Sequence, residues 1–207
     1  ERKDNNREAD WKIFKRHDFT RQIERPHIQL PEYDASILAR LPQPRILSWE
    51  KEGITKEVCS ANLISYYAGG EQIVIPHFDI NNRLVGIRGR ALSDEEAERF
   101  GKYRPLRIGK TLYSHPLSMN LYNLNKSKEN IRKAKAAIVF ESEKSCMKLQ
   151  ALYGHDNDIS VAVCGSAISS YHIALLQEFG VTEIIIAFDR QFVEIGDDEF
   201  KRLKNKL

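Results

Sequence analysis

Residues 136–189 read AAIVFESEKSCMKLQALYGHDNDISVAVCGSAISSYHIALLQEFGVTEIIIAFD. Short apolar stretches alternate here with segments of helical composition. The apolar stretches are 136–140, 159–163 and 183–188, and the helical segments are 143–153 and 168–179. Buried strands that alternate with helices are typical of a parallel sheet with helices on its faces. The stretch therefore predicts a βαβαβ unit and an α/β fold.

Two acidic residues directly follow apolar strands of this unit. Glu141 and Asp189 lie 48 residues apart in the sequence, but neighbouring parallel strands bring such ends to one edge of a sheet. Two converging carboxylates repel each other unless a cation or a proton intervenes, and hard oxygen ligands favour Mg²⁺ or Mn²⁺. Glu143 is close enough in sequence to join them as a third ligand. The alternative is that these acids only cap the helices that follow the strands.

The chain upstream of this unit has a different organisation. Residues 72–78 and 83–88 are rich in β-forming side chains, and the turn-forming sequence Asp79-Ile80-Asn81-Asn82 joins them, which predicts a β-hairpin. We expect three parts in the chain. They are a charged arm with a proline-rich linker at 1–47, a basic α+β subdomain at 48–135, and the βαβαβ unit at 136–207.

Charge is unevenly distributed, although the formal net charge is only +3. Residues 99–135 carry ten basic side chains and one acidic one, whereas residues 151–207 carry five basic and nine acidic ones. A basic surface suits phosphate groups, because Lys and Arg neutralise them and release counterions. The basic segment includes Arg104, Arg107 and Lys110, and Lys144 lies where it could meet a phosphate. The alternative is a solvated, lysine-rich surface.

Composition and motifs disfavour several other classes of protein. The three cysteines are far apart and form no CxxC pair, so neither a zinc finger nor a disulfide scaffold is expected. Gly109-Lys110-Thr111 resembles the end of a P-loop, but Arg104 stands where that motif requires glycine. His77 and His115 have no second histidine at metal-ligand spacing. No signal peptide or membrane span is visible, so we expect a soluble cytoplasmic protein.

Four segments upstream of residue 136 form a specific series. The first two are Gln72-Ile73-Val74-Ile75-Pro76-His77-Phe78-Asp79 and Leu84-Val85-Gly86-Ile87-Arg88-Gly89-Arg90-Ala91-Leu92. The next two are Lys102-Tyr103-Arg104-Pro105 and Leu121-Tyr122-Asn123-Leu124. In this order they resemble the entry to the catalytic core of bacterial and phage replicative primases, including the Lys-Tyr-x-x-Pro region and the segment before the Toprim domain.

Three segments of the α/β unit resemble the Toprim domain of the same primases. Val139-Phe140-Glu141-Ser142-Glu143 is similar to the apolar-Glu-Gly motif, and Val161-Ala162-Val163-Cys164-Gly165-Ser166-Ala167 to the Gly-Thr-Ala strand and loop. Ile184-Ile185-Ile186-Ala187-Phe188-Asp189 resembles the strand that carries the Asp-x-Asp motif. The resemblance covers about residues 45–192 and implies that 136–207 is a Toprim domain behind a basic N-terminal subdomain.

The resemblance implies a DNA primase, a nucleotidyltransferase that makes short RNA primers on single-stranded DNA from ribonucleoside triphosphates. It also implies Mg²⁺ or Mn²⁺, a replicative helicase as partner and no membrane. By position, Glu141 and Asp189 are catalytic metal ligands with Glu143 beside them, and Arg90 and Lys102 are catalytic residues near the nucleotide phosphates. The expected nucleotide- and nucleic-acid-binding residues are Arg88, Arg90, Lys102, Arg104, Arg107, Lys110 and Lys144.

The chain departs from the primase pattern at several positions. Gln191 replaces the second Asp of Asp-x-Asp, and an amide brings no charge to a cation site. Ser142 replaces the usual Gly after Glu141. Residues 136–207 number 72, whereas a Toprim domain needs roughly 100, so the chain is expected to be a fragment. The segment Glu194-Ile195-Gly196-Asp197-Asp198 is either a substitute source of acid or a solvated loop.

Two alternatives to a primase remain open at this stage. The first is a degenerate Toprim module of a phage or mobile element that binds nucleic acid without synthesis, which the Gln191 replacement motivates. The second is an unrelated α/β domain that handles phosphate. In that domain the acids at the strand ends would serve only as helix caps.

Overall fold

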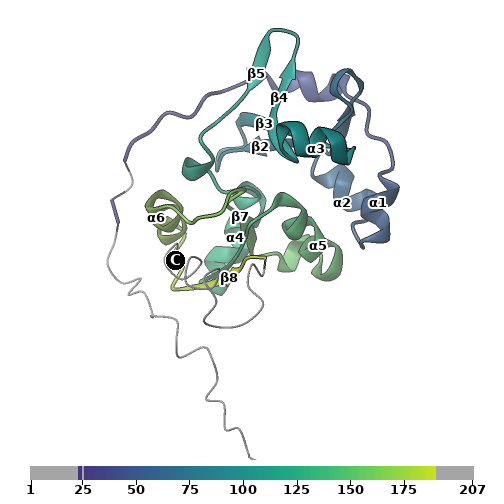
Figure 1. The fold of residues 1–207 in the computed structure, drawn as a ribbon. Coiled ribbons are helices and arrows are strands. Elements are labelled where there is room, and N and C mark those ends of the chain that lie inside the picture. The colour runs from purple at the N-terminus through teal and green to yellow at the C-terminus, as the bar shows by residue number, and fades with distance from the viewer. Residues whose placement is uncertain (1–22, 25, 190–207) are drawn as a thin grey trace, which may run out of the picture.

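The computed structural model describes residues 23–24 and 26–189, and these form two sheets (Figure 1). The first sheet has five antiparallel strands in the order β1-β2-β3-β4-β5, and the second has three parallel strands in the order β7-β6-β8. This mixed architecture confirms the predicted α/β class. Gln191 and the acids of the 194–198 segment lie outside the described residues.

The antiparallel lobe comprises the first sheet and the short helices around it. Its strands are β1 Ser65–Tyr67, β2 Gln72–Phe78, β3 Leu84–Ala91, β4 Tyr103–Ile108 and β5 Thr111–Tyr113. Its α-helices are α1 Leu47–Lys51, α2 Lys56–Ala61 and α3 Asp94–Phe100. The 3-10 helices η2 Ala35–Arg40 and η3 Ala68–Gly70 complete it, while η4 Leu117–Met119, which follows β5, contacts α6 (Ser170–Glu178) of the other lobe.

The predicted hairpin is the centre of this lobe. Strands β2 and β3 pair antiparallel along their length, from Gln72 opposite Ala91 to Phe78 opposite Leu84. The Asp79 carboxylate fixes the turn, because its Oδ1 accepts hydrogen bonds from the backbone N–H groups of Asn81 and Arg83, each at 2.9 Å. An Asx turn of this kind explains why the turn-forming sequence between the strands is a reliable signal.

The parallel lobe contains the second sheet with helices on its faces. Its elements are α4 Leu124–Ala134, β6 Ala136–Phe140, α5 Glu143–Tyr153, η5 His155–Asn157, β7 Ser160–Ala162, α6 Ser170–Glu178 and β8 Glu183–Ala187. Strand β6 lies in the middle, parallel to both neighbours, and Phe140 is opposite Ala187 on β8. The predicted βαβαβ unit is therefore confirmed. Glu141 and Asp189 leave the sheet at the same edge.

Helix α4 packs with the parallel lobe, although the sequence analysis groups it with the basic subdomain at 48–135. Its apolar side chains Leu124 and Ile131 are buried in the core formed by β6, β7 and α6. The basic residues of this helix, including Arg132 and Lys133, dominate its composition and its charge. Charge patterning therefore assigns α4 to the basic segment, while its buried stripe attaches it to the second sheet.

A shared hydrophobic core joins the two lobes. From the antiparallel lobe it takes Trp49, Ile54, Val58, Cys59, Ile64, Ile73 and Ile75, and from the other side Tyr122, Cys146, Met147, Ala162 and Cys164. Met147 and Ile75 are completely buried, and burial of a side chain of that size stabilises by about 1.5–3 kcal/mol. The lobes are thus one packed body, which fixes the walls of any site between them.

Across residues 23–24 and 26–189, no helix combines the length and the apolar character that crossing a bilayer demands.

Candidate active site

A cleft of about 520 Å³ lies between the two lobes, at the carboxyl edge of the parallel sheet. One wall comes from β3 and the start of β4, and the other from the β6–α5 turn, the loop after β7 and the end of β8. Its lining residues are Arg88, Arg90, Lys102, Tyr103, Glu141, Ser142, Glu143, Lys144, Ser145, Lys148, Cys164, Gly165 and Asp189. Ligands of open α/β sheets bind at this kind of edge.

Most of the residues predicted from the sequence converge on this cleft. They are Glu141, Asp189, Glu143, Arg88, Arg90, Lys102 and Lys144. Three predicted basic residues do not line it. Arg104 is ion-paired with Glu96 at 2.7 Å, while Arg107 and Lys110 are exposed on β4 and at the turn between β4 and β5.

Glu141 and Asp189 bring two carboxyl groups to the cleft. They follow adjacent parallel strands that pair up to Phe140 and Ala187, and both residues line the cleft. Carboxylate oxygens are the ligands that Mg²⁺ and Mn²⁺ prefer, so the chemistry of this pair fits such an ion. The basic wall opposite would face the negative groups of a phosphate ligand.

Glu143 has a different environment from the other two acids. Its side chain is completely buried, and its Oε1 lies 2.9 Å from Arg88 Nη1 and 3.0 Å from His77 Nε2. Burial by itself raises the pKa of the Glu143 carboxyl, but the hydrogen bond to His77 and the positive charge of Arg88 outweigh it and lower the pKa to about 2. The carboxylate is thus ionised and neutralised within the protein.

Two histidines extend this buried group into the antiparallel lobe. The rings of His77 and His115 lie 4.8 Å apart between centroids, although the sequence shows them as isolated residues. Burial lowers the pKa of His77, and burial with the neighbouring His77 lowers the pKa of His115 to about 3. Both rings are therefore neutral at ordinary pH, and Arg88 carries the charge that balances Glu143.

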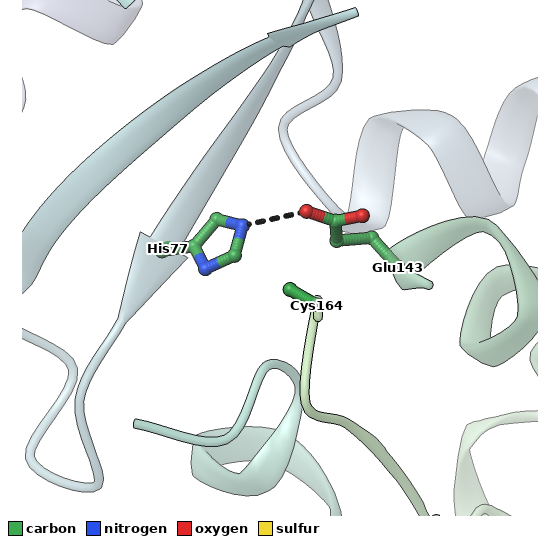
Figure 2. Close-up of side chains that lie close together, drawn as sticks. All are labelled: His77, Glu143 and Cys164. Carbon is green, nitrogen blue, oxygen red and sulfur yellow. Dashed lines mark hydrogen bonds and ion pairs between the residues drawn. The ribbon is translucent and has the colours of Figure 1, made fainter. Parts of the chain in front are cut away.

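Cys164 completes a cluster with the geometry of a metal site (Figure 2). Figure 2 shows His77 on its strand pointing toward Glu143, with Cys164 beside them, and one ligand atom from each lies within 4.8 Å of the others. However, Arg88 already neutralises the carboxylate and also donates to the Cys164 carbonyl at 3.1 Å. The positive charge of the Arg88 guanidinium would repel a divalent cation bound here. We therefore interpret the cluster as a structural link between the lobes.

The contact between the two histidines can be tested at Gly86 on β3. A Cβ at this position would lie 2.1 Å from His115 Nδ1, so the ring has to move. We expect Gly86→Ala to lower the free energy of unfolding by about 1–3 kcal/mol, as overpacking of a core does. Chemical denaturation measures this loss. A variant as stable as the wild type would show that His115 is not held against β3.

Aromatic rings support cations on both walls of the cleft. The Arg90 guanidinium lies 5.8 Å from the Trp49 ring centroid and 5.9 Å from that of Tyr103, and Lys144 Nζ lies 5.7 Å from the Trp49 ring. Trp49 is completely buried, so its ring is a fixed platform for these two cations. Among the described residues no carboxylate forms an ion pair with Arg90, which leaves its charge available to a ligand.

Tyr103 and Lys148 also line the cleft, although the sequence motifs assign neither of them a role there. Tyr103 is the cross-strand partner of Arg90, which places both side chains on the same face of the sheet. Lys148 lies one helical turn after Lys144 on α5, so the two lysines share a face. That i, i+4 spacing was the one signal that could have identified Lys148 in advance.

Comparison with protein-family models gives no match for this chain. Among curated proteins, the chain is 44% identical over 167 residues to the uncharacterized protein YorJ of Bacillus subtilis (strain 168), which derives from the SPbeta prophage. The match covers 79% of this chain and 44% of that protein. The chain therefore spans less than half the length of this relative, and the similarity supports the phage context expected from the sequence.

Solved structures provide the comparison of folds. A DnaG primase catalytic domain bound to single-stranded DNA matches with a TM-score of 0.59 at 19% identity, over 81% of this chain and 61% of that one. The Aquifex aeolicus primase matches with a TM-score of 0.58 at 19% identity (76% and 44%), and the E. coli primase catalytic core with 0.53 at 20% (82% and 60%). The chain thus has the fold of the DnaG primase catalytic core, as its sequence motifs predict.

Proposed function

We propose that this chain is the catalytic core of a primase, which joins ribonucleotides on a single-stranded DNA template in the presence of Mg²⁺ or Mn²⁺. One observation carries the proposal. The cleft between the lobes brings Glu141 and Asp189 of the parallel sheet opposite Arg90 and Lys102 of the antiparallel lobe. Oxygen ligands for an ion and cations that face the same cleft are what transfer of a nucleotidyl group requires.

The residues have separate roles in this proposal. Glu141 and Asp189 would hold the ion, which when bound supplies charge stabilisation at the reacting phosphate. Arg90 and Lys102 would bind the triphosphate and balance the negative charge that develops on the leaving pyrophosphate. Trp49 and Tyr103 hold Arg90 in place by their ring faces, which reduces the entropy lost when it binds the ligand.

Primer synthesis is the direct test of this proposal. The purified chain is incubated with single-stranded DNA, ribonucleoside triphosphates and either Mg²⁺ or Mn²⁺, and a parallel reaction contains a chelator. Oligoribonucleotides that depend on the metal and the template are expected. DNA binding without any product, in either metal, would contradict synthesis by this chain.

A second candidate is a nucleic-acid-binding module without synthesis. The Gln191 replacement favours it, because the Asp-x-Asp motif of primases would then supply one anionic ligand fewer. This candidate expects salt-sensitive binding of single-stranded DNA that does not change when a chelator is added. The two candidates therefore differ in their metal dependence as well as in product formation.

Two arginines allow binding of the nucleotide to be separated from binding of the strand. Arg90 lines the cleft, whereas Arg107 is exposed on β4 away from it. Arg90→Gln is expected to weaken binding of a ribonucleoside triphosphate roughly tenfold, since a charged hydrogen bond contributes about 1.5–3 kcal/mol. Arg107→Gln is expected to leave nucleotide binding unchanged and to reduce the salt slope of single-stranded DNA binding by about 0.7. Calorimetry and fluorescence anisotropy measure the two affinities, and equal effects of both variants would contradict this division.

A further inference from the structure

Two lysines on the parallel-lobe wall of the cleft are held by a single carboxylate from the other lobe. Lys144 and Lys148 lie one turn apart on α5 and both line the cleft. Glu52, the residue that caps the C-terminus of α1, forms an ion pair with Lys144 through Oε1 and with Lys148 through Oε2 at 3.0 Å. Its two oxygens therefore bridge the two ammonium groups.

This bridge resembles the way in which a phosphate group would bind the same lysines. A phosphate offers several anionic oxygens to neighbouring cations, and a carboxylate offers two. Glu52 is not among the residues that line the cleft, and its side chain is 42% exposed, so it reaches the lysines from the outer rim. Solvent screens such an exposed contact, which makes it weak enough for a ligand to replace.

The surroundings of Lys144 keep its position independent of Glu52. The side chain of Lys144 is only 14% exposed, and its ammonium group lies over the buried ring of Trp49. The same ring supports Arg90. Lys144 therefore remains directed into the cleft when its carboxylate partner leaves, and it continues the line of cations that begins with Arg90.

We propose that Lys144 and Lys148 form a phosphate-binding subsite of the cleft, and that Glu52 occupies this subsite in the free protein. The inference deepens the proposed function and rests on binding of phosphate groups in the cleft. Both the triphosphate of a nucleotide and the backbone of a nucleic acid strand carry the required chemistry. Glu52 then lowers the affinity of the cleft for either, because the ligand has to displace it.

The test is the binding of inorganic tripolyphosphate and of a short single-stranded oligodeoxynucleotide to the Glu52→Gln variant. Glutamine keeps the size of the side chain but removes the competing charge. We expect binding to become roughly fivefold to tenfold tighter at low salt, because the two ion pairs of the exposed Glu52 carboxylate, of up to about 1 kcal/mol each, no longer compete. Tighter binding of tripolyphosphate assigns the subsite to the nucleotide. Tighter binding of the oligodeoxynucleotide alone assigns it to the nucleic acid strand.

Glu50→Gln is the matched control for this experiment. Glu50 lies on the same short helix, but its partner is Arg45, at 2.6 Å, and among the described residues it forms no ion pair with the α5 lysines. This variant is expected to bind both probes as the wild type does. An unchanged or lower affinity of Glu52→Gln for both probes would overturn the inference, since Glu52 would then only position the lysines.

Lys148→Gln supplies a second test that does not depend on the Glu52 variant alone. In the wild type its effect is expected to be small, because Glu52 already neutralises Lys148. Combined with Glu52→Gln, it is expected to abolish most of the gain in affinity that Glu52→Gln produces. This departure from additivity measures the coupling between Glu52 and Lys148. If Arg90→Gln weakens tripolyphosphate binding while Glu52→Gln has no effect, the subsite is wrong and the proposed function stands. If Glu52→Gln tightens binding of the probes but the chain makes no primer, the subsite stands and the proposed function is wrong.

Discussion

Glu141→Gln is expected to abolish metal-dependent primer synthesis by the chain, with a loss of at least about a thousandfold. The substitution keeps the shape of the side chain and removes one anionic ligand from the carboxyl edge of the parallel sheet. A metal ion that stabilises the charge of the transition state contributes several kcal/mol, and each 1.36 kcal/mol corresponds to a factor of ten in rate. Asp189→Asn is expected to act in the same direction.

Binding of Mn²⁺ provides a readout that does not require synthesis. An ion that binds only the native state raises the melting temperature by mass action, so millimolar Mn²⁺ should stabilise the wild type but not Glu141→Gln. Glu183→Gln is the matched control, because Glu183 begins β8 at the opposite end of the same sheet. Full synthesis by Glu141→Gln, or an equal shift of the melting temperature by Mn²⁺ in all three proteins, would contradict a role of Glu141 in metal binding.

The strand-end acids show which part of the site the sequence could predict. Glu141 and Asp189 each follow a short apolar run, and parallel strands necessarily place such positions at one edge. The elements that carry them, 136–140, 143–153 and 183–187, agree with the sequence pattern within a residue or two. Local periodicity was sufficient here because each strand is a short apolar run, although β8 lies at the edge of the sheet and leaves Ile185 and Ile186 exposed.

Glu143 shows what local pattern could not reveal. Its position two residues after Glu141 suggested a third metal ligand, but its carboxylate faces His77 and Arg88 from strands far away in the sequence. Arg104 shows the same limitation. It pairs with Gly89 in the ladder, whereas Tyr103 pairs with Arg90 on the cleft side, so strand alternation turns Arg104 toward Glu96. Both outcomes depend on the register of distant strands, which composition does not contain.

Glu143→Gln is expected to cause the largest loss of stability among single substitutions in the cleft. It leaves the Arg88 guanidinium half-buried without its carboxylate, and removal of one partner of a buried pair costs about 3–5 kcal/mol. For a chain of this size, that loss lowers the melting temperature by roughly 10 °C. The double variant Arg88→Met with Glu143→Leu should recover part of it, because the unpaired charge is then absent. Glu50→Gln, which breaks an exposed pair with Arg45, should change the melting temperature little.

The difference between the wild type and Glu143→Gln should also depend on pH in a defined direction. The folded protein holds the pKa of this carboxyl at about 2, against 4.5 as its ordinary value, so the unfolded chain takes up the proton first as the pH falls. The stabilisation is thus complete above about pH 5 and disappears toward pH 2. Denaturation at several pH values measures the difference, and a constant gap between pH 7 and pH 2 would show that Glu143 is not ionised in the folded state.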